Sequence, residues 1–90
     1  MSKVKAKIQI AILKRKTIQA RANYQLPIEL SSRILDLNEN SDVEYVKHLC
    51  LLTEHYIRIK GYYKRFKLAD YEASADIRKG LLEKGFIQND

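Results

Sequence analysis

The chain has 90 residues, with 17 Lys or Arg against 11 Asp or Glu, and its formal net charge at pH 7 is +6. This length allows one small domain with a modest core, so it excludes a large multidomain enzyme and favours a stabilising partner subunit. Cys50 is the single cysteine, which excludes an intrachain disulfide, and the longest apolar run is too short to cross a bilayer. With no hydrophobic signal region either, we expect an intracellular, cytoplasmic protein without membrane contact.

The charge is unevenly distributed along the chain. Residues 1–28 contain seven Lys or Arg and no acid, whereas residues 29–54 contain six Asp or Glu against two basic residues. A second basic patch covers residues 58–67. Two basic regions around an acidic middle favour a polyanionic partner such as nucleic acid, although a solvated surface gives the same pattern.

Apolar and polar residues alternate in two stretches near the start of the chain, residues 4–12 and 17–26. Alternation with a period of two is typical of a strand with one buried face, so we predict a strand over residues 18–25. Read as a helix, the same residues form two apolar faces separated by two polar strips, and their composition favours helix. Residues 3–12 remain open as a second strand, a helix or a mobile arm.

Pro27 is the only proline in the chain. Proline lacks a backbone N–H, which the first turn of a helix does not need, and it favours extended geometry in the residue before it. We therefore predict that a strand ends at Leu26 and that a helix starts at Pro27. Leu30, Ile34 and Leu37 follow at helical spacing and predict one apolar stripe.

Two further helices follow in the predicted order. Ser41 and Glu44 have the spacing of a capping box at the start of a long helix. Asp70 predicts the cap of a last helix over residues 71–84, which Gly85 stops. The seam of the long helix has alternating steps of four and three and consists of Tyr45, Leu49, Leu52, Tyr56, Ile59, Tyr63 and Phe66.

Residues 18–57 resemble the ribbon-helix-helix family of DNA-binding proteins. The residues that carry the resemblance are the alternating strand QARANYQ, the helix start LPIEL, the segment RILDL and the second-helix start SDVEYVKHLC. The resemblance implies a mainly α-helical chain with a short N-terminal β element, forming a ribbon-helix-helix-like homodimer with an added C-terminal helix. The expected divisions are a basic arm or extra strand over residues 1–16, a core over residues 17–60 and a helical extension over residues 61–90.

In that family the strand pairs with its copy in a second subunit, and the two-stranded ribbon enters the DNA major groove. The resemblance thus implies sequence-specific binding of double-stranded DNA by a small transcriptional regulator, nucleoid-associated in a bacterial, archaeal or viral setting. The implied base contacts are Gln19, Arg21, Asn23 and Gln25, and the implied phosphate contacts are Lys14, Arg15, Lys16 and Ser41. The implied dimer or partner interface is Ile18, Tyr24, Leu26, Leu49, Leu52, Tyr56, Ile59, Tyr63 and Phe66.

Other patterns in the sequence are weaker. Residues 70–90 resemble a short helical segment near the C-terminus of cysteinyl-tRNA synthetases, which implies no aminoacylation. His48 and His55 share a predicted helix face with Glu44, whereas Cys50 points towards the seam. Two surface histidines and a buried cysteine are favoured over a metal site. The sequence has no nucleophile motif and no glycine-rich phosphate loop, so we expect neither an enzyme nor a cofactor.

Three other functions fit the sequence. The first is an all-α protein–protein interaction module, in which the N-terminal segment is one long helix and the seam over residues 45–66 binds another protein. The second is the antitoxin of a toxin–antitoxin pair, with the C-terminal extension binding the toxin. The third is sequence-independent coating of nucleic acid by the basic N-terminal arm.

Overall fold

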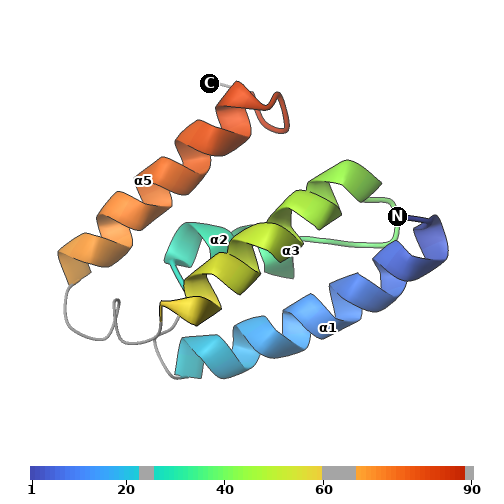
Figure 1. Cartoon of the computed structure of the whole chain (residues 1–90), viewed down its shortest axis with the longest axis horizontal. Coiled ribbons are helices and arrows are strands. Elements are labelled where there is room, and N and C mark those ends of the chain that lie inside the picture. Colours follow the sequence, from blue (N-terminus) through green and yellow to red (C-terminus); the bar gives the residue numbers. More distant parts are fainter. Residues whose placement is uncertain (23–25, 60–66, 89–90) are drawn as a thin grey trace.

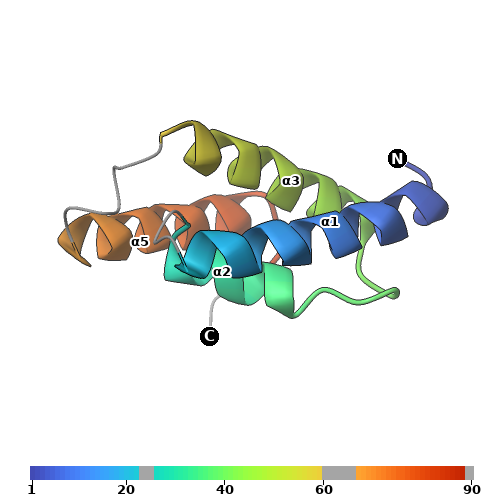
Figure 2. The ribbon, with the colours of Figure 1, turned by 90° about the horizontal axis from the view of Figure 1, so that it is seen from below.

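The computed structural model describes residues 1–22, 26–59 and 67–88, and it describes side chains within residues 1–20, 26–59 and 71–88. This part of the chain contains four helices, α1 (Lys3–Ala22), α2 (Ile28–Leu35), α3 (Val43–Arg58) and α5 (Lys67–Glu83). Figure 1 shows α2 and α3 in the middle of the molecule, with α1 along one edge and α5 along the other. The turned view in Figure 2 separates α3 from α2 and brings α1 into the foreground.

The prediction of a strand over residues 18–25 is wrong, and so is the ribbon-helix-helix-like fold built on it. Residues 18–22 belong to α1, residues 23–25 lie outside the described residues, and no strand occurs within residues 1–22, 26–59 or 67–88. The physical reason is that α1 contains no Gly, Pro, Asn or Asp to interrupt it and consists largely of helix-forming residues. The helix runs unbroken through residues 16 and 17, where the basic arm was expected to meet the core.

The alternating pattern becomes two separate faces once the backbone coils with about 3.6 residues per turn. One face consists of buried residues at alternating steps of four and three, Ala6, Ile10, Leu13, Thr17 and Ala20. We call this set the inner stripe. It packs against α2 and α3, and it accounts for the position of α1 along one edge of the fold.

Helix α2 lies at the centre of the fold, because α1, α3 and α5 all pack against it. Pro27 has extended backbone angles, φ −61° and ψ 148°, and the helix begins at Ile28, which confirms the predicted helix start. Leu30 and Ile34 are fully buried and Leu37 is nearly so, which confirms the predicted apolar stripe. Each such side chain contributes about 1.5–3 kcal/mol through its removal from water.

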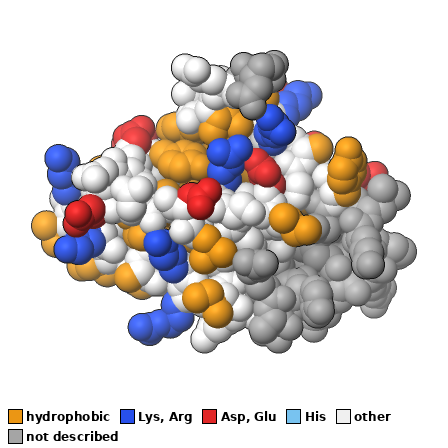
Figure 3. Space-filling model, turned by 180° about the vertical axis from the view of Figure 1, so that it is seen from behind, with side chains coloured by type: hydrophobic (Ala, Val, Ile, Leu, Met, Phe, Trp, Pro, Cys, Tyr) orange, Lys and Arg blue, Asp and Glu red, His pale blue; other side chains and the backbone are white. Residues whose placement is uncertain are grey.

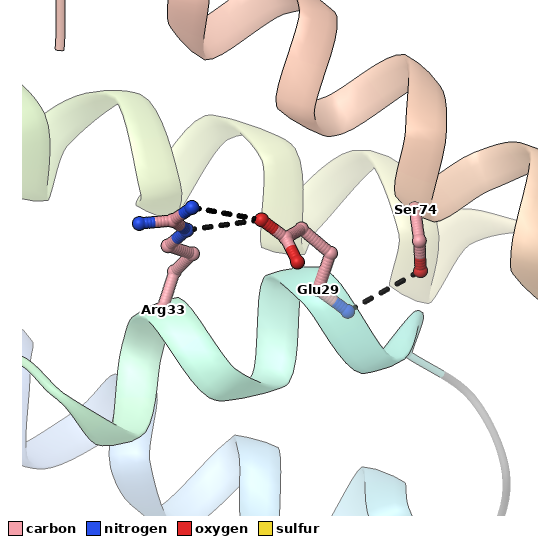
Figure 4. Close-up of polar contacts among 3 residues, drawn as sticks. All are labelled: Glu29, Arg33 and Ser74. Atoms are coloured by element: carbon pink, nitrogen blue, oxygen red, sulfur yellow. Dashed lines mark hydrogen bonds and ion pairs between the residues drawn. The ribbon is translucent and has the colours of Figure 1, made fainter. Parts of the chain in front are cut away.

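A side chain from α5 completes the start of α2. Pro27 has no polar side chain, and it makes no side-chain cap to the helix. The Ser74 hydroxyl of α5 instead accepts a hydrogen bond from the backbone N–H of Glu29, with an N–O distance of 3.3 Å (Figure 4). The Glu29 carboxylate pairs with Arg33 on the next turn, at 2.9 Å. The first turn of α2 therefore depends on a residue 45 positions further along the chain.

Helix α3 begins one residue later than the predicted capping box requires. Its N-cap is Asp42, whose carboxylate accepts a hydrogen bond from the backbone N–H of Glu44 at 3.2 Å. The Ser41 hydroxyl accepts a hydrogen bond from the N–H of Asn38 at 3.0 Å instead. A carboxylate is favoured here by the partial positive charge of the helix N-terminus. The capping box is therefore wrong, although the predicted helix is present.

Helix α5 ends where the sequence predicts, although it starts before the expected cap at Asp70. Gly85 has a left-handed backbone with φ 76°, a conformation that glycine adopts at low cost. The N–H of Phe86 donates to the carbonyl of Leu81 at 3.0 Å, and the N–H of Gly85 donates to that of Leu82 at 3.1 Å. These two bonds form a Schellman motif, so the role of Gly85 as the helix stop is confirmed.

The turn after α5 places an aromatic side chain on α3. The ring centroid of Phe86 lies 5.5 Å from that of Tyr45 and 5.4 Å from that of His48. Tilted ring contacts of this kind stabilise the fold by about 0.5–1.5 kcal/mol in addition to the free energy gained from burying their apolar surface. Phe86 thereby connects the turn after α5 to α3.

Helix α3 ends at Arg58. The predicted seam residues Tyr63 and Phe66 lie outside the described residues.

Ser74→Ala should lower the free energy of unfolding by about 1 kcal/mol, because the N–H of Glu29 loses its acceptor at a partly buried helix start. Urea denaturation followed by circular dichroism measures this change. Ser32 is exposed on α2, the helix whose start Ser74 caps, so Ser32→Ala is the matched control and should stay within about 0.5 kcal/mol of wild type. Equal losses in the two variants would contradict the capping role of Ser74.

Candidate functional site

The side of α1 that faces away from the protein is also apolar. Of the eight large hydrophobic side chains that are exposed in the described part of the chain, four lie on α1. They are Val4 (71% exposed), Ile8 (55%), Ile12 (39%) and Ile18 (63%). With the exposed residues Ala11 and Arg15 they form a band opposite the inner stripe, which we call the outer stripe. Figure 2 views the molecule with this helix nearest to the reader.

Basic side chains border the outer stripe on both sides. Helical spacing places three lysines along one border and two along the other. The first row is Lys3, Lys7 and Lys14, and the second is Lys5 and Lys16. Residues 1–28 contain no acid, so α1 supplies no negative charge of its own to neutralise these rows. An aliphatic band between two positive borders results.

One border of α1 meets α3 at a half-buried cysteine. The thiol of Cys50 lies 4.0 Å from the side-chain oxygen of Gln9 on α1. Burial raises the pKa of the Cys50 thiol, Glu54 raises it further and Lys16 opposes the rise. The thiol is therefore protonated at neutral pH and serves packing, and Glu54 is an acid of α3 that lies near this border.

The face of the molecule opposite the view of Figure 1 has mixed charges. Figure 3 shows the side of the molecule that faces away in Figure 1, and basic, acidic and hydrophobic side chains are interspersed there. The exposed hydrophobic residues outside the N-terminal segment are spread over three helices, with Ile28 on α2, Leu51 on α3 and Tyr71 on α5. The described residues thus concentrate both exposed aliphatic surface and positive charge on α1.

Of the four predicted base contacts, the two whose backbone the structure describes, Gln19 and Arg21, lie on α1 and not on a strand. Gln19 is exposed on α1 beside the outer stripe. Arg21 lies in the last turn of α1, its side chain is outside the described part, and Asn23 and Gln25 are also outside it. Because residues two apart lie on different sides of a helix, the alternation that selected these positions does not place positions 19 and 21 on one face.

The predicted phosphate contacts fall in two separate places. Lys14, Arg15 and Lys16 lie together on α1, where Arg15 and Lys16 are exposed and Lys14 is half-buried. Ser41 lies before α3, whose N-terminus already holds the carboxylate of Asp42. That carboxylate would repel a phosphate, so only the three residues on α1 form a basic surface.

Much of the predicted interface is covered within the single chain. Three of its residues, Leu26, Leu49 and Tyr56, are buried in the core, and Leu52 and Ile59 pack against that core. Ile18 is exposed on the outer stripe. The remaining three, Tyr24, Tyr63 and Phe66, lie outside the described residues. The expected homodimer followed from an unpaired strand. A helix satisfies its own backbone, so that reason no longer applies, and dimerisation stays a prediction.

The two histidines of α3 do not converge. His48 packs against Phe86, whereas the ring of His55 lies 5.0 Å from that of Tyr56 in an edge-to-face arrangement. Within the described ranges, no three His, Cys, Asp or Glu side chains gather closely enough to hold a metal ion. Burial lowers the pKa of His48, and the nearby charge of Lys84 lowers it further.

The sequence indicates the outer stripe only as the second apolar face of a helical reading. Of its residues, only Arg15, as a phosphate contact, and Ile18, as an interface residue, have a predicted role. Its specific signal is a second set of steps of four and three. That set is Val4, Ile8, Ala11, Arg15 and Ile18. Two interleaved sets of this kind in one segment identify a helix with two contact faces.

No protein-family model, curated protein or solved structure matches this chain. Among the described helices, none has both the length and the apolar character needed to cross a membrane. The surface chemistry of α1 is therefore the basis on which a function is proposed.

The stability of the fold should decrease as the pH falls below about 6.5, the ordinary pKa of histidine. The folded state lowers the pKa of His48, so the unfolded chain binds a proton more readily, and this protonation lowers the free energy of the unfolded chain relative to the folded one. The contribution of neutral His48 to the stability of the fold is complete above the pKa that His48 has in the unfolded chain. This contribution is lost as the pH falls through the lower pKa that His48 has in the folded protein. Urea denaturation at a series of pH values measures the free energy of unfolding, which should change less with pH in His48→Gln over the same interval. An unchanged pH dependence in this variant would contradict the role of His48.

Proposed function

We propose that this protein is an all-α protein–protein interaction module whose binding surface is the outer stripe of α1, and that an amphipathic helix of another protein docks there. The observation that carries this proposal is the exposure of Val4, Ile8 and Ile18, each more than half exposed on a helix whose other face already holds it in the fold. Each isoleucine buried on docking contributes up to about 1.5–3 kcal/mol. Exposed apolar area gathered on one element is typical of an interaction site.

The spacing of the outer stripe favours a helix as the partner. Positions 4, 8, 11, 15 and 18 repeat in alternating steps of four and three, which is the periodicity of helices that interlock side chains along a shared seam. The small side chain of Ala11 lies in the middle of the seam, where it permits close approach of another backbone. A helix laid along the stripe would contact successive turns of α1.

The sequence also suggested an interaction module, but with a different surface. The seam over residues 45–66 was expected to bind the partner, whereas Leu49 and Tyr56 of that seam are buried within the chain itself. The outer stripe of α1 therefore replaces that seam as the proposed binding surface.

A set of synthetic three-heptad helical peptides tests the proposal. The peptides share one leucine seam except at the single position that faces Arg15, and they differ in the charge at that position and at the flanking residues. At least one peptide should bind ¹⁵N-labelled protein, and the backbone amide shifts should concentrate on Val4, Ile8 and Ile18. Replacing both isoleucines, Ile8→Gln with Ile18→Gln, should weaken that peptide by about tenfold or more, because two apolar contacts are removed.

Leu51→Gln is the matched control for these variants. Leu51 is exposed on α3, so its replacement removes a similar apolar side chain from a different face and should leave peptide binding unchanged. Circular dichroism should show the same helix content in every variant, because all three positions are exposed. Shifts that concentrate on α3 or α5, or an equal effect of the Leu51 variant, would contradict the proposal.

A second candidate function is sequence-independent nucleic-acid binding through the lysines of α1. The observation in its favour is the combination of two basic borders with no acid in residues 1–28. Duplex DNA titrated against salt measures it, and phosphate contact predicts an affinity that falls steeply with salt. Lys7→Gln should then reduce the salt slope by about 1, whereas Ile8→Gln should have little effect. A loss caused by the isoleucine variant and not by the lysine variant would contradict this candidate.

A further inference from the structure

We infer that the partner helix is acidic and carries a carboxylate opposite Arg15, an inference that rests on the proposed function. Arg15 is exposed and lies inside the outer stripe, one turn from Ala11 on one side and one turn from Ile18 on the other. A partner that covers the stripe must also cover this guanidinium. A covered charge without a partner is costly, so the facing position requires an anion, and a carboxylate accepts the paired hydrogen bonds that a guanidinium donates.

The borders of the outer stripe point to the same chemistry. Lysines occupy both borders and α1 itself has no acid, while Glu54 of α3 lies near the border that holds Lys16. In paired helices the residues that flank the seam of one helix face those that flank the seam of the other, and opposite charges there determine the choice of partner. A helix with acids on both of its own flanks is therefore the electrostatic complement of α1.

A second copy of the chain is a poor occupant of this surface. Two outer stripes laid together would oppose lysine rows to lysine rows, and in register Arg15 would face its own copy, with no acid in residues 1–28 to compensate. Like charges brought face to face in this way disfavour association. The net charge of +6 adds to this repulsion over the whole molecule.

An anionic lipid surface also matches the lysines but fits the stripe less well. A helix that lies on a lipid surface needs a broad apolar face and does not need regularly spaced apolar residues. The outer stripe instead has the regular steps of a seam between paired helices. Its centre holds the charge of Arg15, which is unfavourable in an acyl layer, and it has no aromatic side chain of the kind that anchors interfacial helices. These features favour a protein helix over a membrane.

The peptide set described above tests the inference when its members are ranked by affinity. The three versions carry Glu, Gln or Lys on both flanks, and the Glu version also carries Glu at the position facing Arg15. Isothermal titration calorimetry on the full chain should rank the Glu peptide at least about tenfold above the Gln peptide and show no binding of the Lys peptide. The advantage of the Glu peptide should shrink at higher salt.

A charge exchange isolates the role of Arg15. Arg15→Glu should weaken the Glu peptide by about tenfold or more, and a peptide with Lys at the single facing position should bind this variant better than it binds wild type. Arg78→Glu is the matched control, since Arg78 is exposed on α5 and its replacement changes the net charge equally. The control should retain wild-type ranking and lose only a small, uniform amount of affinity.

Each other outcome overturns the inference in a recognisable way. If the Glu and Gln peptides bind equally well and Arg15→Glu does not change peptide affinity, the partner is not acidic, although the outer stripe is still a docking surface. Failure of all peptides removes the proposed function as well. Recruitment to phosphatidylserine vesicles in the absence of peptide binding assigns the stripe to a lipid surface. A wild-type dimer in sedimentation, lost in Ile8→Gln, assigns it to a second copy.

Discussion

The enclosure of α2 is the constraint on which the rest of the structure depends. This helix has eight residues, and an isolated helix of that length is not stable in water. It exists because α1, α3 and α5 pack against it and its side chains Leu30 and Ile34 are fully buried, and because Ser74 supplies the acceptor that Pro27 lacks at its start. The same enclosure determines how α1 is rotated. The inner stripe faces α2 and α3, and none of the other described helices packs against α1, so within the described part of the chain the opposite face of α1 stays exposed.

Helix α1 therefore carries more apolar surface than the fold can use. A single-domain protein of this size has one core, and the inner stripe satisfies it. The remaining isoleucines would promote nonspecific association if they stood in a neutral surface. In the proposed complex, the lysine rows on both borders would oppose a second copy and attract an oppositely charged helix. The same arrangement of charges would then determine the choice of partner.

Much of the helical framework could be predicted from the sequence, because the signals are local. Pro27 marks the start of α2 and Gly85 the end of α5, and each acts through its own backbone. The state of α1 could not be predicted so simply, because Ala6, Ile10 and Ala20 fit both a strand alternation and a helix seam. Which of two apolar faces becomes core is decided by the neighbouring helices, and neither that choice nor the bond from Glu29 to Ser74 has a local signature.

Binding at the outer stripe also bears on the stability of the domain. The residues proposed to contact a partner are exposed, and those that hold the fold lie on the opposite side of the same helix. A partner that binds only the helical form of α1 stabilises that form, by about 2.7 kcal/mol when its concentration is 100 times its dissociation constant. Because α1 covers α2, this stabilisation reaches the whole core. A domain of 90 residues is marginal alone, so an occupied outer stripe would supply the stabilising partner that so small a core favours.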